Sequence, residues 1–187
     1  RKHPGQATTE QLRGTCQVGL GQPEAARASY ERAVKRDPLY FPAVASLAAL
    51  DISEKKPQEA EKRFDGLLAQ QPAHLQALLA VAGLRKRNGG SHEEVAALLA
   101  NAIKLNPTSA APRVQLIDHH LAARQAAPAL VAAQEAEARL PSNVQVLDAL
   151  GRAQAVNGNA NQAITTFNKL ASMQPNSAMR HLRLADV

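Results

Sequence analysis

Residues 144–177 read VQVLDALGRAQAVNGNANQAITTFNKLASMQPNS, and this stretch of 34 residues decides the fold. Apolar side chains recur every three or four residues on both sides of Gly158, which is the spacing of amphipathic helices. Gly158 gives the backbone the freedom that a tight turn needs, and Pro175 ends the second helix because proline lacks the amide hydrogen. The stretch therefore predicts two antiparallel helices that end at a proline.

The same unit recurs along the whole chain of 187 residues. Six prolines follow one another at intervals of 34 or 35 residues: Pro4, Pro38, Pro72, Pro107, Pro141 and Pro175. With Pro38 as repeat position 32, each unit has a helix A over roughly positions 2–14 and a helix B over roughly 17–30. The other five prolines fall in the first turns of these helices, where proline is tolerated: Pro23, Pro42, Pro57, Pro112 and Pro128.

The turn between helices A and B needs a residue that adopts positive φ. Three units have glycine there, namely Gly21, Gly89-Gly90 and Gly158, while Lys55 and Arg124 occupy the turn in the other two. The one extra residue lies in the turn at 88–91, where an insertion disturbs no packing.

The composition agrees with an all-α protein. Apolar residues make up 45% of the chain but aromatic residues only 3%, which favours close-packed helices over sheets. No apolar run approaches the length of about eighteen residues needed to span a bilayer. The net charge of +6 is dispersed, so we expect no nucleic-acid binding.

Small and large residues recur at facing positions and resemble the tetratricopeptide repeat family. That motif has small residues at positions 8 and 20 and large ones at 7 and 24. The small residues here are Gly14, Ala48, Ala82 and Gly151, then Ala26, Ala60, Ala129 and Ala163; the large ones are Leu47, Val81, Leu116, Leu150 and Leu184, then Tyr30, Phe64, Leu99 and Phe167. The resemblance implies a right-handed superhelical α-solenoid in a single domain, with repeats at 7–40, 41–74, 75–109, 110–143 and 144–177, and a partial sixth at 178–187. We expect the chain to be part of a longer array.

The sequence departs from the family pattern in two ways. The aromatic residues of positions 4 and 11 are missing, and position 11 holds Gln17, Asp51, Arg85, His120 and Gln154. The fourth unit also has Ala133 where an aromatic residue is expected, so we expect its packing to be the loosest.

Two stretches are similar to a bacterial subfamily, the tetratricopeptide lipoproteins of PEP-CTERM protein-sorting and exopolysaccharide systems. They are residues 37–43, DPLYFPA, and residues 150–185, from LGRAQ at 150–154 through LRLA at 182–185. This resemblance implies export across the inner membrane, to the periplasm or as an anchored lipoprotein, and a role in assembling extracellular polysaccharide. Without it, the protein would be cytoplasmic.

The family resemblance implies a concave groove formed by the A helices, which binds a protein or peptide segment. The groove positions from the second repeat onward hold Ala45, Ala49, Ile52, Gln76, Leu79, Gly83, Lys86, Val114, Asp118, Leu121, Gln145, Asp148 and Arg152. Small apolar residues lie at the centre and charges of both signs at the flanks, a surface suited to an extended or helical segment. The alternative is that Ala49, Leu79 and Val114 only pack neighbouring repeats together.

No catalytic, metal or cofactor site is predicted. In Asp118-His119-His120 adjacent side chains point about 100° apart on a helix and cannot converge on one ion, so His120 is read as packed or partly exposed. Cys16 is read as a small buried apolar group. Two other functions stay open: polyanion or polysaccharide binding through Arg85, Lys86 and Arg87, or a passive spacer. Self-association through the terminal repeats, at Leu182 and Leu184, is a further expectation.

Overall fold

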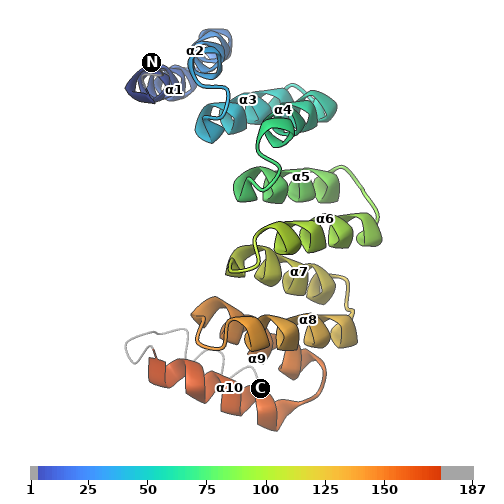
Figure 1. Ribbon diagram of the computed structural model, residues 1–187. Coiled ribbons are helices and arrows are strands. Elements are labelled where there is room, and N and C mark those ends of the chain that lie inside the picture. The colour runs from blue at the N-terminus through green and yellow to red at the C-terminus, as the bar shows by residue number, and fades with distance from the viewer. Residues whose placement is uncertain (1–3, 174–187) are drawn as a thin grey trace. The chain divides into compact units, whose positions relative to one another are not determined.

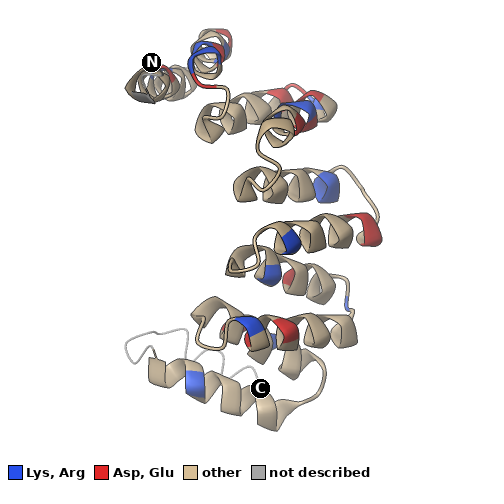
Figure 2. Ribbon diagram, viewed as in Figure 1, with Lys and Arg blue, Asp and Glu red and all other residues tan. Residues whose placement is uncertain are grey.

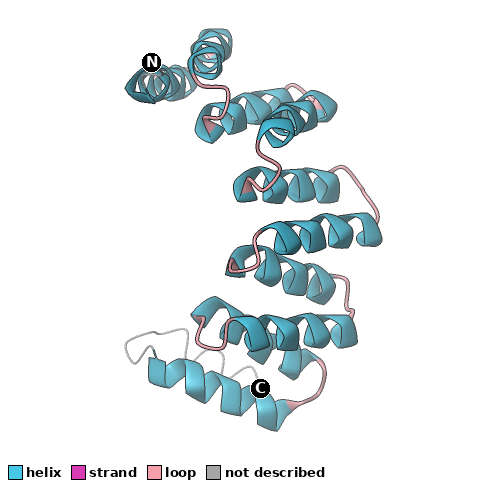
Figure 3. Cartoon of the chain, viewed as in Figure 1, coloured by secondary structure: helices cyan, strands magenta, loops and turns pink. Residues whose placement is uncertain are grey.

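The computed structural model describes residues 4–173, which form ten α-helices joined by short loops and no strands (Figure 3). The A helices are α1 (Pro4–Gly19), α3 (Phe41–Ser53), α5 (Leu75–Arg87), α7 (Ala110–Ala122) and α9 (Val144–Val156). The B helices are α2 (Pro23–Arg36), α4 (Pro57–Gln70), α6 (His92–Leu105), α8 (Ala126–Arg139) and α10 (Ala160–Met173). Every B helix covers positions 17–30, as the proline spacing predicts.

The chain divides into two compact units, residues 1–90 and 91–187, and each has its own core. Figure 1 labels α1 to α5, which belong to the first unit, and α6 to α10, which belong to the second. That the five repeats form one continuous right-handed array stays a prediction. The expected helix at 178–187, with Leu182 and Leu184, lies outside the described residues. None of the described helices combines the length and apolar character needed to cross a bilayer.

The five A–B turns share one backbone conformation. Gly21, Gly89 and Gly158 have φ between 71° and 82°, and Lys55 and Arg124 have φ of 62° and 57°. The predicted positive φ is thus confirmed in all five repeats, including the two that lack glycine.

Replacing Lys55 or Arg124 by glycine is expected to raise the free energy of unfolding by about 1 kcal/mol, because a side chain in the left-handed region costs about 1–2 kcal/mol. Urea unfolding followed by circular dichroism measures the change. Ala100→Gly, at an exposed position in the middle of α6, is the control and should lower stability by a similar amount. Loss of stability at both turn positions would contradict the argument.

The core of each repeat forms where position 8 of helix A faces position 24 of helix B. In the first and fifth repeats position 8 is a buried glycine, and a Cβ added at Gly14 or Gly151 would lie within 3 Å of the ring of Tyr30 or Phe167. These rings are 3% exposed. Glycine at position 8 therefore makes room for the aromatic ring.

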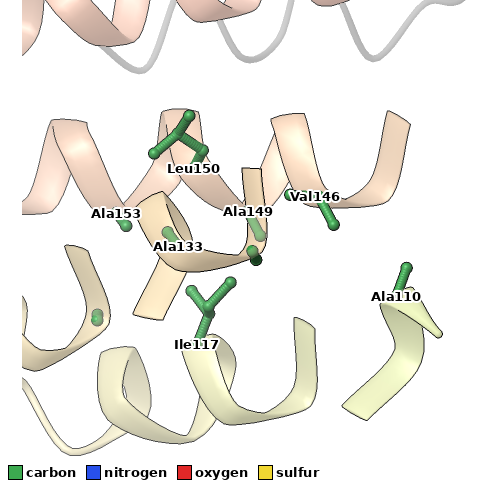
Figure 4. Close-up of a cluster of buried hydrophobic side chains, with 9 residues drawn as sticks. Ala110, Ile117, Ala133, Val146, Ala149, Leu150 and Ala153 are labelled. Carbon is green, nitrogen blue, oxygen red and sulfur yellow. The ribbon is translucent and has the colours of Figure 1, made fainter. Parts of the chain in front are cut away.

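The fourth repeat reverses this size pattern. Ile117, at position 8, is fully buried, and so is Ala133 at position 24 in the same cluster (Figure 4). Ile117 points from α7 toward Ala133 on α8 and Ala149 on α9. Leu116, expected in the core, is only half-buried, and Ile117 is the large residue of this helix that lies in the cluster. The expected loose packing is therefore not found at Ala133.

Polar residues at position 11 bind partners where the family has an aromatic ring. In three repeats the partner is at position 23 of the same repeat: the Ser29 hydroxyl donates to Gln17 Oε1 at 2.7 Å, the Thr166 hydroxyl to Gln154 Oε1 at 2.8 Å, and the Arg63 guanidinium to Asp51. Gln154 and Asp51 are buried. Hydrogen bonds replace aromatic packing at this position.

Asp51 is the most enclosed of these groups, with its side chain 3% exposed. Arg27 Nη1 donates to Asp51 Oδ1 at 2.8 Å, and Arg63 binds the carboxylate from α4. Burial alone would raise the pKa of Asp51, but the hydrogen bonds from Arg63 and Arg27 outweigh it and lower the pKa. Arg27 also binds Glu54 at 2.7 Å, so this network joins α2, α3 and α4.

A pocket of about 270 Å³ lies beside the second repeat's core. It is lined by Val34, Pro38, Val44, Leu47, Lys62, Arg63, Gly66, Leu67 and Gln70. Val44 is at position 4, where the family has an aromatic ring, so the missing ring leaves this space. None of the predicted groove residues lines the pocket.

Candidate binding surface on the A helices

In the first unit, the predicted groove residues form what we call the α3 and α5 surface. It consists of Ala45, Ala49, Ile52, Gln76, Leu79 and Lys86. All six are half-buried or exposed, whereas Ala48 and Ala82, at the neighbouring position 8, are 1% exposed. The surface therefore lies outside the repeat cores.

The α3 and α5 surface is mostly apolar and small. Ala49 is exposed, and Gly83 holds the same repeat position on α5, where an added Cβ would meet no atom within 4 Å. Charged residues are sparse on α3 and gather in the last turn of α5 (Figure 2). Such a surface gains free energy by covering apolar groups rather than by pairing charges.

In the second unit, two predicted groove residues pack against the hydrophobic core. Val114 and Leu121 are half-buried and lie against the cluster that contains Ile117 and Leu150. For these two residues the packing alternative is supported. Gln145, at the start of α9, is exposed.

The structure brings the other three groove residues of this unit together. Arg152 Nη1 lies 2.6 Å from Asp118 Oδ1, and Arg152 Nε lies 2.9 Å from Asp148 Oδ2. Burial alone would lower the pKa of Arg152, but Asp118 and Asp148 raise it. The ion pairs join α7 to α9 and hold the guanidinium in place, while the Asp118 side chain stays 46% exposed.

Two predictions about reactive side chains have different outcomes. Cys16 is exposed, so its assignment as a buried group is wrong. Cys16 is at repeat position 10. The same position is buried in the later A helices, because the B helix of the preceding repeat packs on it. No described helix precedes α1, so Cys16 has no such cover among the described residues. His120 is half-buried as predicted, but it contacts His92, whose position the sequence reading did not connect to it.

The basic clusters of the first unit are largely paired. Arg85 binds Glu61, Lys62 Nζ lies 2.8 Å from Glu59, and Lys56 Nζ lies 2.8 Å from Glu54. These carboxylates lower the positive potential that a polyanion would meet. Between residues 4 and 173, no group of three or more His, Cys, Asp or Glu side chains is arranged to hold a metal ion.

Comparison with known families gives two matches, both described as tetratricopeptide repeat, over residues 17–82 and 145–177. No curated protein matches the chain. Among solved structures, the chain is similar to TTC0263, a tetratricopeptide protein of Thermus thermophilus, with 21% identity, a TM-score of 0.63, and coverage of 96% of this chain and 97% of that one.

Two further structures have the same fold. YrrB, described as a tetratricopeptide protein with an unusual peptide-binding site, has 16% identity, a TM-score of 0.58, and coverage of 97% and 92%. MamA from Desulfovibrio magneticus RS-1 has 16% identity, a TM-score of 0.61, and coverage of 92% and 97%. At these identities the similarity shows the fold alone.

Proposed function

Because this chain belongs to the tetratricopeptide repeat family, whose fold is typically a non-enzymatic interaction scaffold, we propose that it is a scaffold that binds a peptide segment of a partner protein. The contact surface is the α3 and α5 surface, and the peptide is bound mainly by burial of apolar groups. We propose no enzymatic activity and no cofactor.

One observation carries the proposal. Ala49 is an apolar residue that stays exposed in the middle of α3, between the buried Ala48 and Leu50. A partner that covered Ala49 and the flanking half-buried Ala45 and Ile52 would remove apolar surface from water without disturbing the core. The charged residues at the end of α5 would then form the polar rim.

Ala49→Glu is expected to weaken peptide binding by about tenfold or more, because the new carboxylate would be buried unpaired under the ligand. The probe is a random peptide library displayed on phage and selected against the unaltered protein. Ala69→Glu, on the exposed face of α4, is the matched control and should bind the selected peptides normally.

Two outcomes would overturn this assignment. Equal binding by both glutamate variants would move the contact away from α3, and a selection that yields no peptides at all would favour a passive spacer. Binding that is lost at about 0.5 M salt would instead indicate the basic surface around Lys86 and Arg87, since screening weakens contacts between exposed charges.

The resemblance of residues 37–43 and 150–154 to PEP-CTERM lipoproteins supports a narrower proposal. On that sequence resemblance alone, we propose that the scaffold acts outside the inner membrane, in the export or assembly of exopolysaccharide. Fractionation of cells of the source organism tests it. Recovery of the protein with the cytoplasm would overturn the narrower proposal and leave the scaffold function standing.

A further inference from the structure

Three histidines meet at the junction of α6 and α7 in the second unit. His92 is the first residue of α6, and its ring stacks on that of His119, with centroids 4.1 Å apart and planes 8° from parallel. His119 Nε2 lies 3.0 Å from the backbone oxygen of His92. Because a carbonyl only accepts, His119 Nε2 carries the hydrogen, and His119 orients His92 by both contacts.

Two further side-chain contacts beside this stack share one atom, His120 Nδ1. His92 Nε2 lies 3.0 Å from His120 Nδ1, which also lies 3.0 Å from Gln125 Oε1. A single hydrogen on His120 Nδ1 would be shared between two acceptors. A cation between these atoms would instead use a lone pair from each of them.

We propose that His92 Nε2, His120 Nδ1 and Gln125 Oε1 form a binding site for a divalent transition metal ion. With metal–nitrogen distances of about 2.0–2.1 Å, the separation of the two ring nitrogens corresponds to an angle of about 95° at the ion. An angle near 90° is typical of tetragonal Cu²⁺ or Ni²⁺ coordinated by nitrogen and oxygen. All three residues are half-buried, so water completes the coordination.

The local backbone holds these donors in place. The Ser91 hydroxyl accepts from Glu94 N at 3.1 Å, and Glu94 Oε2 accepts from Ser91 N at 2.9 Å, which fixes the start of α6 next to His92. The Gln125 backbone amide donates to the His120 carbonyl at 2.9 Å. The donors therefore come from three helix ends whose positions are already set, which favours chelation.

Calorimetric titration of untagged protein with NiCl₂ tests the site. All proteins in this titration carry His3→Ala, so that the imidazole of His3 cannot bind nickel. We expect one ion per chain, and His92→Asn or His120→Asn should weaken binding by at least about tenfold, in line with the loss of metal-site groups. His74→Asn, a half-buried histidine of the first unit, is the matched control and should bind as the parent does. Magnesium should not bind, because imidazole is a poor ligand for it.

A second measurement needs no altered histidine at the site. Long-range ¹H–¹⁵N spectra during a zinc titration should show changes at His92 Nε2 and His120 Nδ1 and none at His74. The proposal fails if nickel binds equally well to the double variant His92→Asn/His120→Asn, if no heat is observed, or if the zinc shifts fall on other histidines.

Discussion

Phe167→Ala and Gly151→Ile are each expected to destabilise the second unit severely, and the two changes together are expected to cost far less than their sum. Phe167→Ala empties a buried site and should cost about 3–5 kcal/mol. Gly151→Ile places side-chain atoms where the Phe167 ring already lies, since an added Cβ would stand 2.6 Å from Phe167 Cζ, and should cost about 3 kcal/mol or more.

The double variant reproduces the pair that the fourth repeat uses, Ile117 facing Ala133. We expect a coupling energy of at least about 2 kcal/mol, because the two residues fill one shared space. Urea unfolding followed by circular dichroism gives all four free energies. Gly83→Ile is the control, because Gly83 is exposed and an added Cβ there would meet no atom within 4 Å, and stability should stay level or rise. Additive costs at Gly151 and Phe167 would show that the two repeats are not built alike.

Asp51→Asn is expected to lower the free energy of unfolding by about 2–3 kcal/mol near pH 7, because it removes the charge of an almost fully buried carboxylate that pairs with two arginines. The cost lies below the usual range for a buried pair because the Arg27 and Arg63 side chains, 23% and 29% exposed, keep contact with water. Urea unfolding at neutral pH measures this difference.

The effect of Asp51→Asn should depend on pH with a defined sign. The folded pKa of Asp51 lies below its ordinary value, so its stabilising contribution is present above the unfolded pKa of about 4 and is lost as the pH falls through the folded pKa. The difference between parent and variant should therefore shrink below about pH 4. Hydrogen bonds from Lys56 and Arg27 lower the pKa of Glu54 to about 2. Glu54 therefore adds to the acid sensitivity of the parent protein.

Asp65→Asn is the matched control for Asp51. Asp65 is exposed, and partial desolvation and the charge of Glu61 raise its pKa, so its charge gives no stabilising contribution comparable to that of Asp51. Asp65→Asn should leave stability near pH 7 unchanged or raise it. A pH-independent cost for Asp51→Asn would mean that the side chain matters for its shape and not for its charge.

The helices and turns of this protein could be predicted from the sequence because proline and glycine act locally. Proline is tolerated in the first turn of a helix and disfavours the helix interior, so its spacing limits where a helix can begin and end. The positive φ at Lys55 and Arg124 followed from their place in the repeat, although neither residue prefers it. Repeat position also placed Ala49 of α3 outside the core, where it is exposed.

Contacts that depend on pairs of side chains were harder to predict. The polar residues at position 11 look like lost packing until position 23 is read with them, where Ser29, Arg63 and Thr166 supply the partners. His92 and His120 are 28 residues apart in the chain, and their contact depends on how α6 meets α7. The exchange of sizes between Ile117 and Ala133 was also not predicted, because the sequence analysis did not compare position 8 with position 24 of the same repeat.

The size match between positions 8 and 24 also defines which segments of the gene can be exchanged between repeats without separating residues that pack together. Each large residue is matched within its own repeat, so a recombination point in the loop between one repeat and the next keeps every matched pair together. A crossover in the A–B turn would join a helix with isoleucine at position 8 to one with phenylalanine at position 24, or glycine to alanine. The helix pair, and not the single helix, is therefore the module whose duplication keeps each size-matched pair intact.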